Sequence, residues 1–160
     1  MTLVLRTATA TDVPTILRMV HDLATFEREP DAVHATEADL LRDGFGAEPK
    51  FHVQLAEIDG KPAGFALWYF NYSTWEGRAG IHLEDLWVAE FARGQNVGKR
   101  LVAELAKIAI GLGARRLDLN VLTWNPARNF YEKLGITDRE DWRGYRISGD
   151  KLKALAAQAG

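Results

Sequence analysis

The sequence predicts a mixed α/β fold, in which a mixed but mostly antiparallel β-sheet carries helices on both of its faces. Some segments repeat apolar residues with the period of a strand, and others with the period of a helix. Two β-rich runs surround Asp59-Gly60, a pair that is typical of the turn in an antiparallel hairpin. After this hairpin, strand and helix patterns alternate, which indicates a sheet covered by helices.

The first half of the chain reads as a strand, two helices and the hairpin. Residues 3–9 show the short alternation of a strand. A helix follows over residues 11–26, with a Thr or Asp cap and with Pro14 in its first turn. A second, shorter helix over residues 36–44 opens with a variant of the capping box and ends at a glycine. The two strands of the hairpin occupy residues 51–72.

The second half alternates strands and helices that are bounded by capping or turn residues. In its clearest helix, Asn125 is the expected N-cap, Pro126 takes the first helical position and Gly135 follows the last turn. In chain order, we expect a strand at 81–88, a helix at 97–112, a strand at 115–122, a helix at 125–135, a strand at 144–148 and a helix at 150–158.

Length and composition indicate one domain over residues 1–160. A chain of 160 residues that is 47% hydrophobic can bury a substantial core, and it contains no repeat or Gly/Ser/Pro linker. A net charge of −2 with scattered Lys and Arg argues against nucleic acid as the main partner. A small cationic or neutral substrate fits this charge better.

The absence of cysteine excludes disulfides, thiolate zinc sites and a covalent thioester on the enzyme. The four histidines show no spacing typical of a metal site, so no metal is expected. No apolar run approaches the roughly 18 residues of a membrane span, and the chain does not begin like a signal peptide. We therefore expect no membrane association and a cytoplasmic location.

The loop between the strand at 81–88 and the next helix has the spacing of an anion-binding turn. It is not a P-loop, because three residues separate Gly94 from Gly98 and Lys99 is followed by Arg100. It is not a dinucleotide fingerprint, because Asn96 stands where the second glycine belongs. Backbone N–H groups at a helix N-terminus still favour an anion. The alternative is an ordinary strand-to-helix connection.

Several motifs together resemble one family. "RGQNVG" is similar to the R/Q-x-x-G-x-G/A pyrophosphate loop of the GNAT N-acetyltransferases, with Asn in place of one glycine. "RTATATDVPTILRMVHDLATFE", "DGFG", "YFNYSTWEGR", "LEDLWV" and "WNPARNFYEKLG" also resemble the spermidine/spermine and thialysine acetyltransferase branch in order and spacing. The resemblance covers roughly residues 3–142. It implies the GNAT fold, acetyl-CoA as the co-substrate and a small amine as the acceptor.

The resemblance also implies where acetyl-CoA binds. The loop would hold its pyrophosphate, and backbone groups at the end of the preceding strand would line its pantetheine arm and thioester. Asn96 departs from the family pattern, and a side chain there stands where the pyrophosphate approaches closely. The expected cofactor-binding residues are Leu86, Trp87, Val88, Arg93, Gly94, Gln95, Asn96, Val97, Gly98, Lys99, Asn125, Ala127 and Arg128.

Two residues match the catalytic positions of the family. Glu84 would accept the proton of the amine, directly or through water, and Tyr131 would protonate the departing thiolate. The alternatives are a solvated strand carboxylate and a tyrosine at the edge of the core. Because side chains alternate along a strand, we expect Glu84 and Asp85 to point to opposite faces. His82 would share the face of Glu84.

The acceptor amine would meet acidic and aromatic side chains. Phe26 and Glu27 match an aromatic-acidic pair of the family, and Glu84 and Asp85 add further carboxylates. Trp75 and Trp142 could offer ring faces to an ammonium group, although most aromatic residues belong to the core.

The sequence thus predicts an N-acetyltransferase that acts on the primary amine of a diamine, a polyamine or a thialysine-like amino acid. A non-catalytic acyl-CoA-binding module and an acetyltransferase of protein amines remain as alternatives. The branch that the chain resembles implies a homodimer, by analogy alone.

Overall fold

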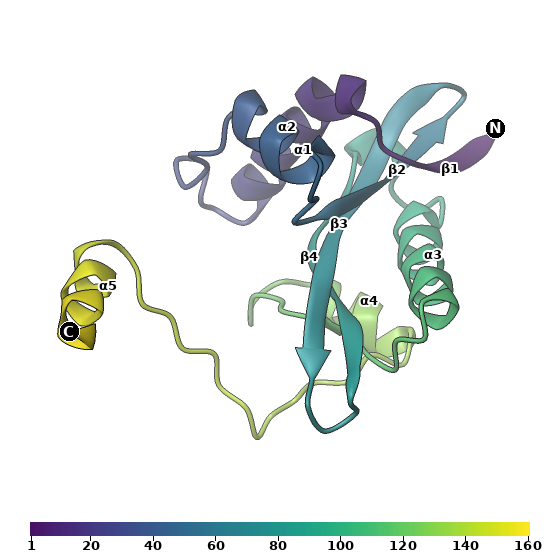
Figure 1. Ribbon diagram of the computed structural model, residues 1–160. Helices are drawn as coiled ribbons and strands as arrows, with labels where there is room; N and C mark the ends of the chain where they lie inside the picture. Colours follow the sequence, from purple (N-terminus) through teal and green to yellow (C-terminus); the bar gives the residue numbers. More distant parts are fainter. The chain divides into compact units, whose positions relative to one another are not determined.

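The computed structural model describes residues 1–160, which divide into two compact units. The first unit comprises residues 1–125 and contains the whole sheet, and the second comprises residues 126–160 (Figure 1). The expectation of a single domain over the whole chain stays a prediction.

The sheet has five strands in the order β1-β2-β3-β4-β5. The first three pairings are antiparallel and the β4–β5 pairing is parallel, so the predicted mixed, mostly antiparallel sheet is confirmed. The strands are β1 (Leu3–Thr7), β2 (His52–Ile58), β3 (Lys61–Ser73), β4 (Arg78–Val88) and β5 (Leu117–Leu119).

Helices cover both faces of the sheet, as predicted. In the first unit, α1 (Val13–Phe26) and α2 (Glu37–Phe45) lie on one face and α3 (Val97–Gly111) lies on the other (Figure 1). No helix is long and apolar enough to cross a lipid bilayer. The second unit contains α4 (Ala127–Lys133) and α5 (Gly149–Ala156), and three short 3-10 helices complete the chain: η1 (Ala10–Asp12), η2 (Glu90–Ala92) and η3 (Ala157–Ala159).

The turn of the β2–β3 hairpin confirms the Asp59-Gly60 prediction. Both residues have positive φ, 49° at Asp59 and 78° at Gly60, as a two-residue type I′ turn requires. The Asp59 carboxylate also accepts a hydrogen bond from the backbone N–H of Thr2, at 2.8 Å. This contact ties the start of the chain to the turn.

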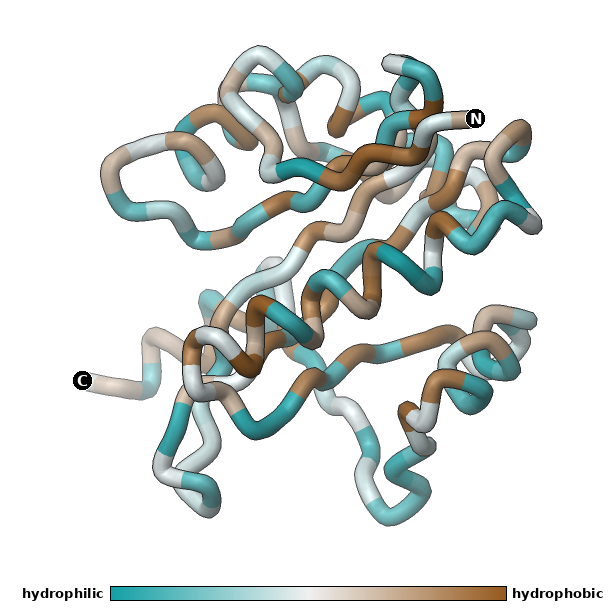
Figure 2. The backbone as a smooth tube through the Cα atoms, turned by 90° about the vertical axis from the view of Figure 1, so that its right-hand side faces the viewer, coloured by the Kyte–Doolittle hydropathy of each residue, from teal (hydrophilic) through white to brown (hydrophobic).

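The main core lies between the sheet and α1. Ile16 and Met19 of α1 pack against Leu55, Phe65 and other buried side chains of β2 and β3. Figure 2 shows hydrophobic residues along the strands, whereas hydrophobic and hydrophilic residues alternate along the surface helices. Burial of this apolar surface fixes α1 on the sheet and so fixes the position of its C-terminal end.

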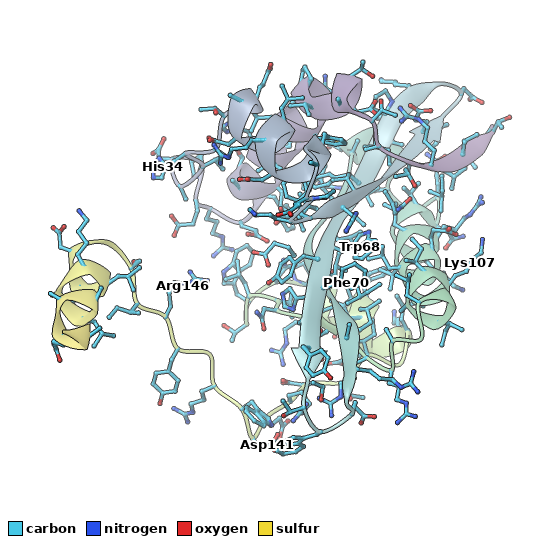
Figure 3. The ribbon with its side chains drawn as sticks, viewed as in Figure 1. His34, Trp68, Phe70, Lys107, Asp141 and Arg146 are labelled. Carbon is cyan, nitrogen blue, oxygen red and sulfur yellow. The ribbon has the colours of Figure 1, made fainter.

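The face under α3 has its own layer of buried side chains. Val97, Leu101 and Leu105 of α3 are buried. Trp68 and Phe70 lie beside β3 on this side, with their ring centroids 5.3 Å apart (Figure 3). Odd-numbered and even-numbered residues of β3 therefore point to opposite faces of the sheet, and the odd-numbered ones point toward α1.

Three predicted elements differ from the structure. Residues 144–148 form no strand, because no other strand pairs with them. The strand expected at 115–122 shortens to β5, because only three of its residues pair with β4. Helix α4 begins at Ala127 with Pro126 as its N-cap residue, one position later than the predicted Asn125 cap.

Candidate active site

A β-bulge in β4 sets the geometry of the site. Leu67 of β3 pairs with Asp85, but its neighbour Trp68 pairs with Leu83. Glu84 is therefore an extra residue in β4 with no partner of its own. A bulge breaks the strict alternation of side chains along a strand. The prediction that Glu84 and Asp85 point to opposite faces is wrong for this reason.

Both carboxylates lie on the face that α1 covers. Asp85 stands opposite Leu67, which belongs to the α1-side core. Glu84 contacts two side chains of the same face. The hydroxyl of Tyr69 donates to Glu84 Oε2 at 3.3 Å, and His82 Nε2 lies 3.4 Å from the same oxygen. The prediction that His82 shares the face of Glu84 is confirmed.

Glu27 completes a cluster of three carboxylates, which we call the acidic cluster (Glu27, Glu84 and Asp85). Glu27 is the C-cap residue of α1. Burial, followed by repulsion from Glu84, raises the pKa of Glu27. Burial, then Glu84 and then Glu27, raise the pKa of Asp85 from 3.8 to about 6. Like charges held together in this way favour a bound proton or a bound cation.

The end of β4 has an open edge next to the acidic cluster. β5 pairs with β4 only at residues 81–83, so residues 84–88 have no strand on that side. On the other side β4 remains paired with β3 as far as Val88, which stands opposite Gly64. The open edge leaves backbone N–H and C=O groups for a ligand. It includes Leu86, Trp87 and Val88, the residues expected to line the pantetheine arm.

The loop after β4 forms a turn with an open helix N-terminus. Gly94 and Asn96 both adopt the left-handed conformation, with φ of 76° and 61°. Asn96 is the N-cap residue of α3, and no side chain accepts a hydrogen bond at this cap. The first N–H groups of α3 are therefore open to an anion. In the first turn Val97 is buried, Gly98 is half-buried and Lys99 is exposed.

Arg93 turns back toward the sheet. Its Nε donates to the carbonyl of Val88 at 3.2 Å, and its guanidinium lies 4.8 Å from the ring centroid of Trp87 and 5.6 Å from that of Phe26. Gln95 donates from Nε2 to the carbonyl of Phe91 at 2.8 Å, which ties the turn to η2. In this conformation Arg93 links the loop to the end of α1.

Aromatic rings gather where α1 ends. Phe26 lies 5.9 Å from Trp87 and 6.3 Å from Trp124, measured between ring centroids. Arg28 stacks over Trp124, with its guanidinium carbon 3.9 Å from the ring centroid. The structure therefore brings the predicted pair Phe26 and Glu27 to the end of β4.

Sequence reasoning missed three residues of this region: Tyr69, Trp124 and Arg28. Tyr69 becomes a partner of Glu84 only through the β3–β4 register, which no local pattern encodes. Arg28 carries a positive φ of 66°, a conformation that its residue type does not predict. Trp124 directly precedes the Asn-Pro pair that marks the start of α4. This position is the only feature of the sequence that indicates a role for Trp124 at the site.

The two other predicted aromatic residues lie elsewhere. Trp75 is 81% exposed at the tip of the β3–β4 hairpin. Arg78 lies six positions before Glu84 in β4, a span of roughly 20 Å, so the structure does not bring Trp75 to the acidic cluster of its own chain. Trp142 belongs to the second unit, where it is 60% exposed and lies 5.4 Å from the Arg139 guanidinium.

The remaining predicted residues lie at or after the boundary between the units. The backbone N–H of Asn125 donates to the carbonyl of Leu122 at 2.9 Å. Ala127, Arg128 and Tyr131 belong to α4, where the Tyr131 ring contacts Phe130 with centroids 5.1 Å apart. Arg128 pairs with Asp138 at 3.4 Å. Their predicted roles toward the cofactor and the leaving thiol stay predictions.

A family model matches the part of the chain that contains the described site. Residues 16–136 match the model of the acetyltransferase (GNAT) family. This range contains most of α1, the whole of β4, the loop and α4. The open N-terminus of α3 and the open edge of β4 thus both lie within the matched region.

Individual proteins are similar to the chain over nearly its full length. A thialysine N-epsilon-acetyltransferase from Bos taurus is 37% identical over 96% of this chain and 97% of its own. A spermidine/spermine N(1)-acetyltransferase-like protein from Homo sapiens is 37% identical over 95% of this chain, but over 23% of its own length. Among solved structures, an integron cassette protein from the mobile metagenome of V. cholerae superposes with a TM-score of 0.82, covers 98% of both chains and is 26% identical.

Proposed function

The chain belongs to the GNAT family and is an acetyl-CoA-dependent N-acetyltransferase, and from this premise we propose that its acceptor is a small cationic amine. The acceptor class comprises diamines, polyamines and thialysine-like amino acids. The acidic cluster of Glu27, Glu84 and Asp85 carries this proposal.

The acidic cluster provides more negative charge than the acetyl-transfer chemistry needs. One carboxylate suffices to accept a proton from the amine. Burial and then Glu84 raise the pKa of Glu27, and burial, Glu84 and Glu27 raise the pKa of Asp85. A bound ammonium group relieves the repulsion between these carboxylates. The names of both curated relatives point to amine acceptors, thialysine in one and spermidine or spermine in the other. A cationic acceptor explains why the three carboxylates stand together.

The binding of acetyl-CoA is proposed along two neighbouring parts of the first unit. The open N-terminus of α3 and the left-handed turn at Gly94 and Asn96 suit a pyrophosphate, because N–H groups converge there. The open edge of β4 suits the amide groups of a pantetheine arm. Both parts lie next to the acidic cluster in β4, so one ligand could run from the loop to Glu84.

The proposed reaction is a direct transfer. The amine loses a proton to Glu84, and its nitrogen attacks the thioester carbonyl carbon. The C–N bond forms and the C–S bond breaks, and Tyr131 supplies the proton that the departing thiolate takes. The second proton that the nitrogen loses restores Tyr131, directly or through water. The absence of cysteine agrees with attack without an acyl-enzyme intermediate.

Release of free CoA across a panel of amines tests this proposal. The panel comprises thialysine, lysine, ornithine, putrescine, spermidine and spermine, with a lysine-containing peptide as the protein-amine arm. We expect turnover with at least one free amine and little with the peptide. Tyr131→Phe should lower this turnover while acetyl-CoA binding persists. Turnover on the peptide alone, or on no amine, would contradict the proposal.

We also propose that the protein is a cytoplasmic homodimer. Acetyl-CoA is a metabolite of the cell interior, which supports the location. The segment at 142–148 supports the dimer, because it leaves Trp142, Tyr145 and Ile147 exposed and pairs with no strand of its own chain. Light scattering coupled to size exclusion should give twice the chain mass, and a monomer mass at micromolar protein would contradict the dimer.

A further inference from the structure

A row of polar residues crosses the sheet beside the acidic cluster. Tyr69 of β3 pairs with His82 of β4, and His82 pairs with Asp118 of β5. The neighbours of His82 along β4, Ile81 and Leu83, are buried apolar residues. Ile81 and Leu83 pair with Phe70 and Trp68 and so point to the α3 side of the sheet, whereas the polar row lies on the opposite face. Partly buried polar side chains on that face are stabilised when they are hydrogen-bonded.

Two members of the row converge on one oxygen of Glu84. Tyr69 donates its hydroxyl to Oε2 at 3.3 Å, and His82 Nε2 lies 3.4 Å from Oε2. The rings of Tyr69 and His82 stack against each other, with centroids 5.0 Å apart and planes 30° apart. Glu84 Oε1 makes neither of these contacts. The arrangement fixes one carboxylate oxygen and leaves the other for an acceptor.

The two side chains that contact Glu84, those of Tyr69 and His82, are more restricted in position than the Glu84 side chain. The His82 side chain is 13% exposed, whereas that of Glu84 is 51% exposed. Burial, followed by the charge and hydrogen bond of Glu84, raises the pKa of Tyr69, so its hydroxyl remains a donor at neutral pH. An exposed carboxylate on a bulge has rotational freedom, and the hydrogen bond from Tyr69 together with the close approach of His82 restricts it.

The other end of the row is fixed as well. Asn71 donates from Nδ2 to Asp118 Oδ2 at 3.1 Å, across β4. Gly80 makes this contact possible, because a Cβ at Gly80 would lie 2.5 Å from Asn71 Oδ1. His82 therefore stands between two ordered groups, Asp118 on β5 and Glu84 on β4.

We propose that His82 and Tyr69 are positioning residues for acetyl transfer: they hold Glu84 Oε2 and so aim Oε1 at the proton of the acceptor amine. This proposal rests on the role proposed above for Glu84. A general base must lie within hydrogen-bond reach of the proton that it accepts, and a misplaced base loses rate steeply. No metal and no further reactant takes part.

Tyr69 and His82 contact Glu84 at the same oxygen. Glu27 and Asp85 complete the acidic cluster, and Asp118 stands beside His82 on β5. In this arrangement a change at Tyr69 or His82 acts on the acceptor amine through Glu84.

Steady-state kinetics of single and double variants test the proposal, with the best amine from the panel. We expect His82→Phe to lower kcat by roughly 10- to 100-fold and to leave the KM for acetyl-CoA unchanged. His82→Gln keeps a polar N–H group at this position and should restore most of the rate.

Glu84→Gln is the background that separates positioning from a general structural role. If His82 acts through Glu84, His82→Phe should have no further effect in Glu84→Gln. An equal loss in both backgrounds would overturn the proposal, as would full activity of His82→Phe. If Glu84→Gln itself keeps full turnover, the proposed role of Glu84 fails first. Should His82→Phe not fold, Tyr69→Phe, which keeps the ring, decides by the same comparison.

Discussion

At the scale of single residues, the carboxyl group of Asp85 has a strongly raised pKa. Burial and its two acidic neighbours raise its pKa from 3.8 to about 6. A carboxyl with a raised pKa stabilises the fold only while it is protonated, relative to an ordinary carboxyl. This stability is fully present below pH 4 and is lost as the pH rises through 6. At neutral pH, Asp85 therefore destabilises the free protein.

Replacing Asp85 by Asn should remove this penalty. We expect Asp85→Asn to raise the free energy of unfolding at pH 8 by about 1–3 kcal/mol, and to have little effect at pH 4. Denaturant unfolding at the two pH values measures the difference. An equal change at both would show that the effect is one of packing, and a loss of stability at pH 8 would contradict the account.

Asn96 gives a second prediction at the residue scale. Its φ of 61° suits Gly better than any other residue, and its side chain does not cap α3. We expect Asn96→Gly to keep the fold and to tighten acetyl-CoA binding by a few-fold, because it removes a side chain beside the open N–H groups. Asn96→Ala, the matched control, should weaken binding. Calorimetric titration checks both. Weaker binding by Asn96→Gly would show instead that the amide is a ligand.

At the scale of elements, the bulge and the open edge make β4 the element on which the proposed site depends. Its apolar alternation was readable from the sequence, and so were the turn before β3 and the helix after the loop. The bulge was not, because it depends on the register between β3 and β4 rather than on local residue types. For this reason the sequence identified Glu84 and Asp85 as candidates but placed them on different faces.

The close approach of β3 to the end of β4 gives a prediction at this scale. A Cβ at Gly64 would lie 2.5 Å from the backbone carbonyl oxygen of Trp87, so the two strands would have to separate. We expect Gly64→Ala to destabilise the protein by about 1–3 kcal/mol and to weaken acetyl-CoA binding.

Gly60→Ala provides a control for Gly64→Ala. A Cβ at Gly60 meets no atom within 4 Å, although its positive φ adds some strain. This variant should lose stability and yet keep acetyl-CoA affinity. Thermal unfolding with and without acetyl-CoA measures both effects. If Gly64→Ala keeps the ligand-induced shift of the parent, the open edge of β4 is not part of the cofactor site.

At the scale of the whole molecule, the sequence predicted the first unit well and the end of the chain poorly. Helices on both faces and the strand pairings of the hairpin follow from local periodicity, capping and turn chemistry. Residues 144–148 have a strand-like composition, but a strand needs a partner, and this chain supplies none. Contacts that depend on register, such as Tyr69 with Glu84, could not be predicted from the sequence either.

The proposal that the acidic cluster binds a small cationic amine for acetylation is tested by mass spectrometry. An equimolar mixture of the panel amines is incubated with isotope-labelled acetyl-CoA and either the parent protein or Glu84→Gln. We expect a labelled N-acetyl product from the parent and roughly 100-fold less from Glu84→Gln. No labelled amine from the parent, or equal labelling by the two proteins, would contradict it.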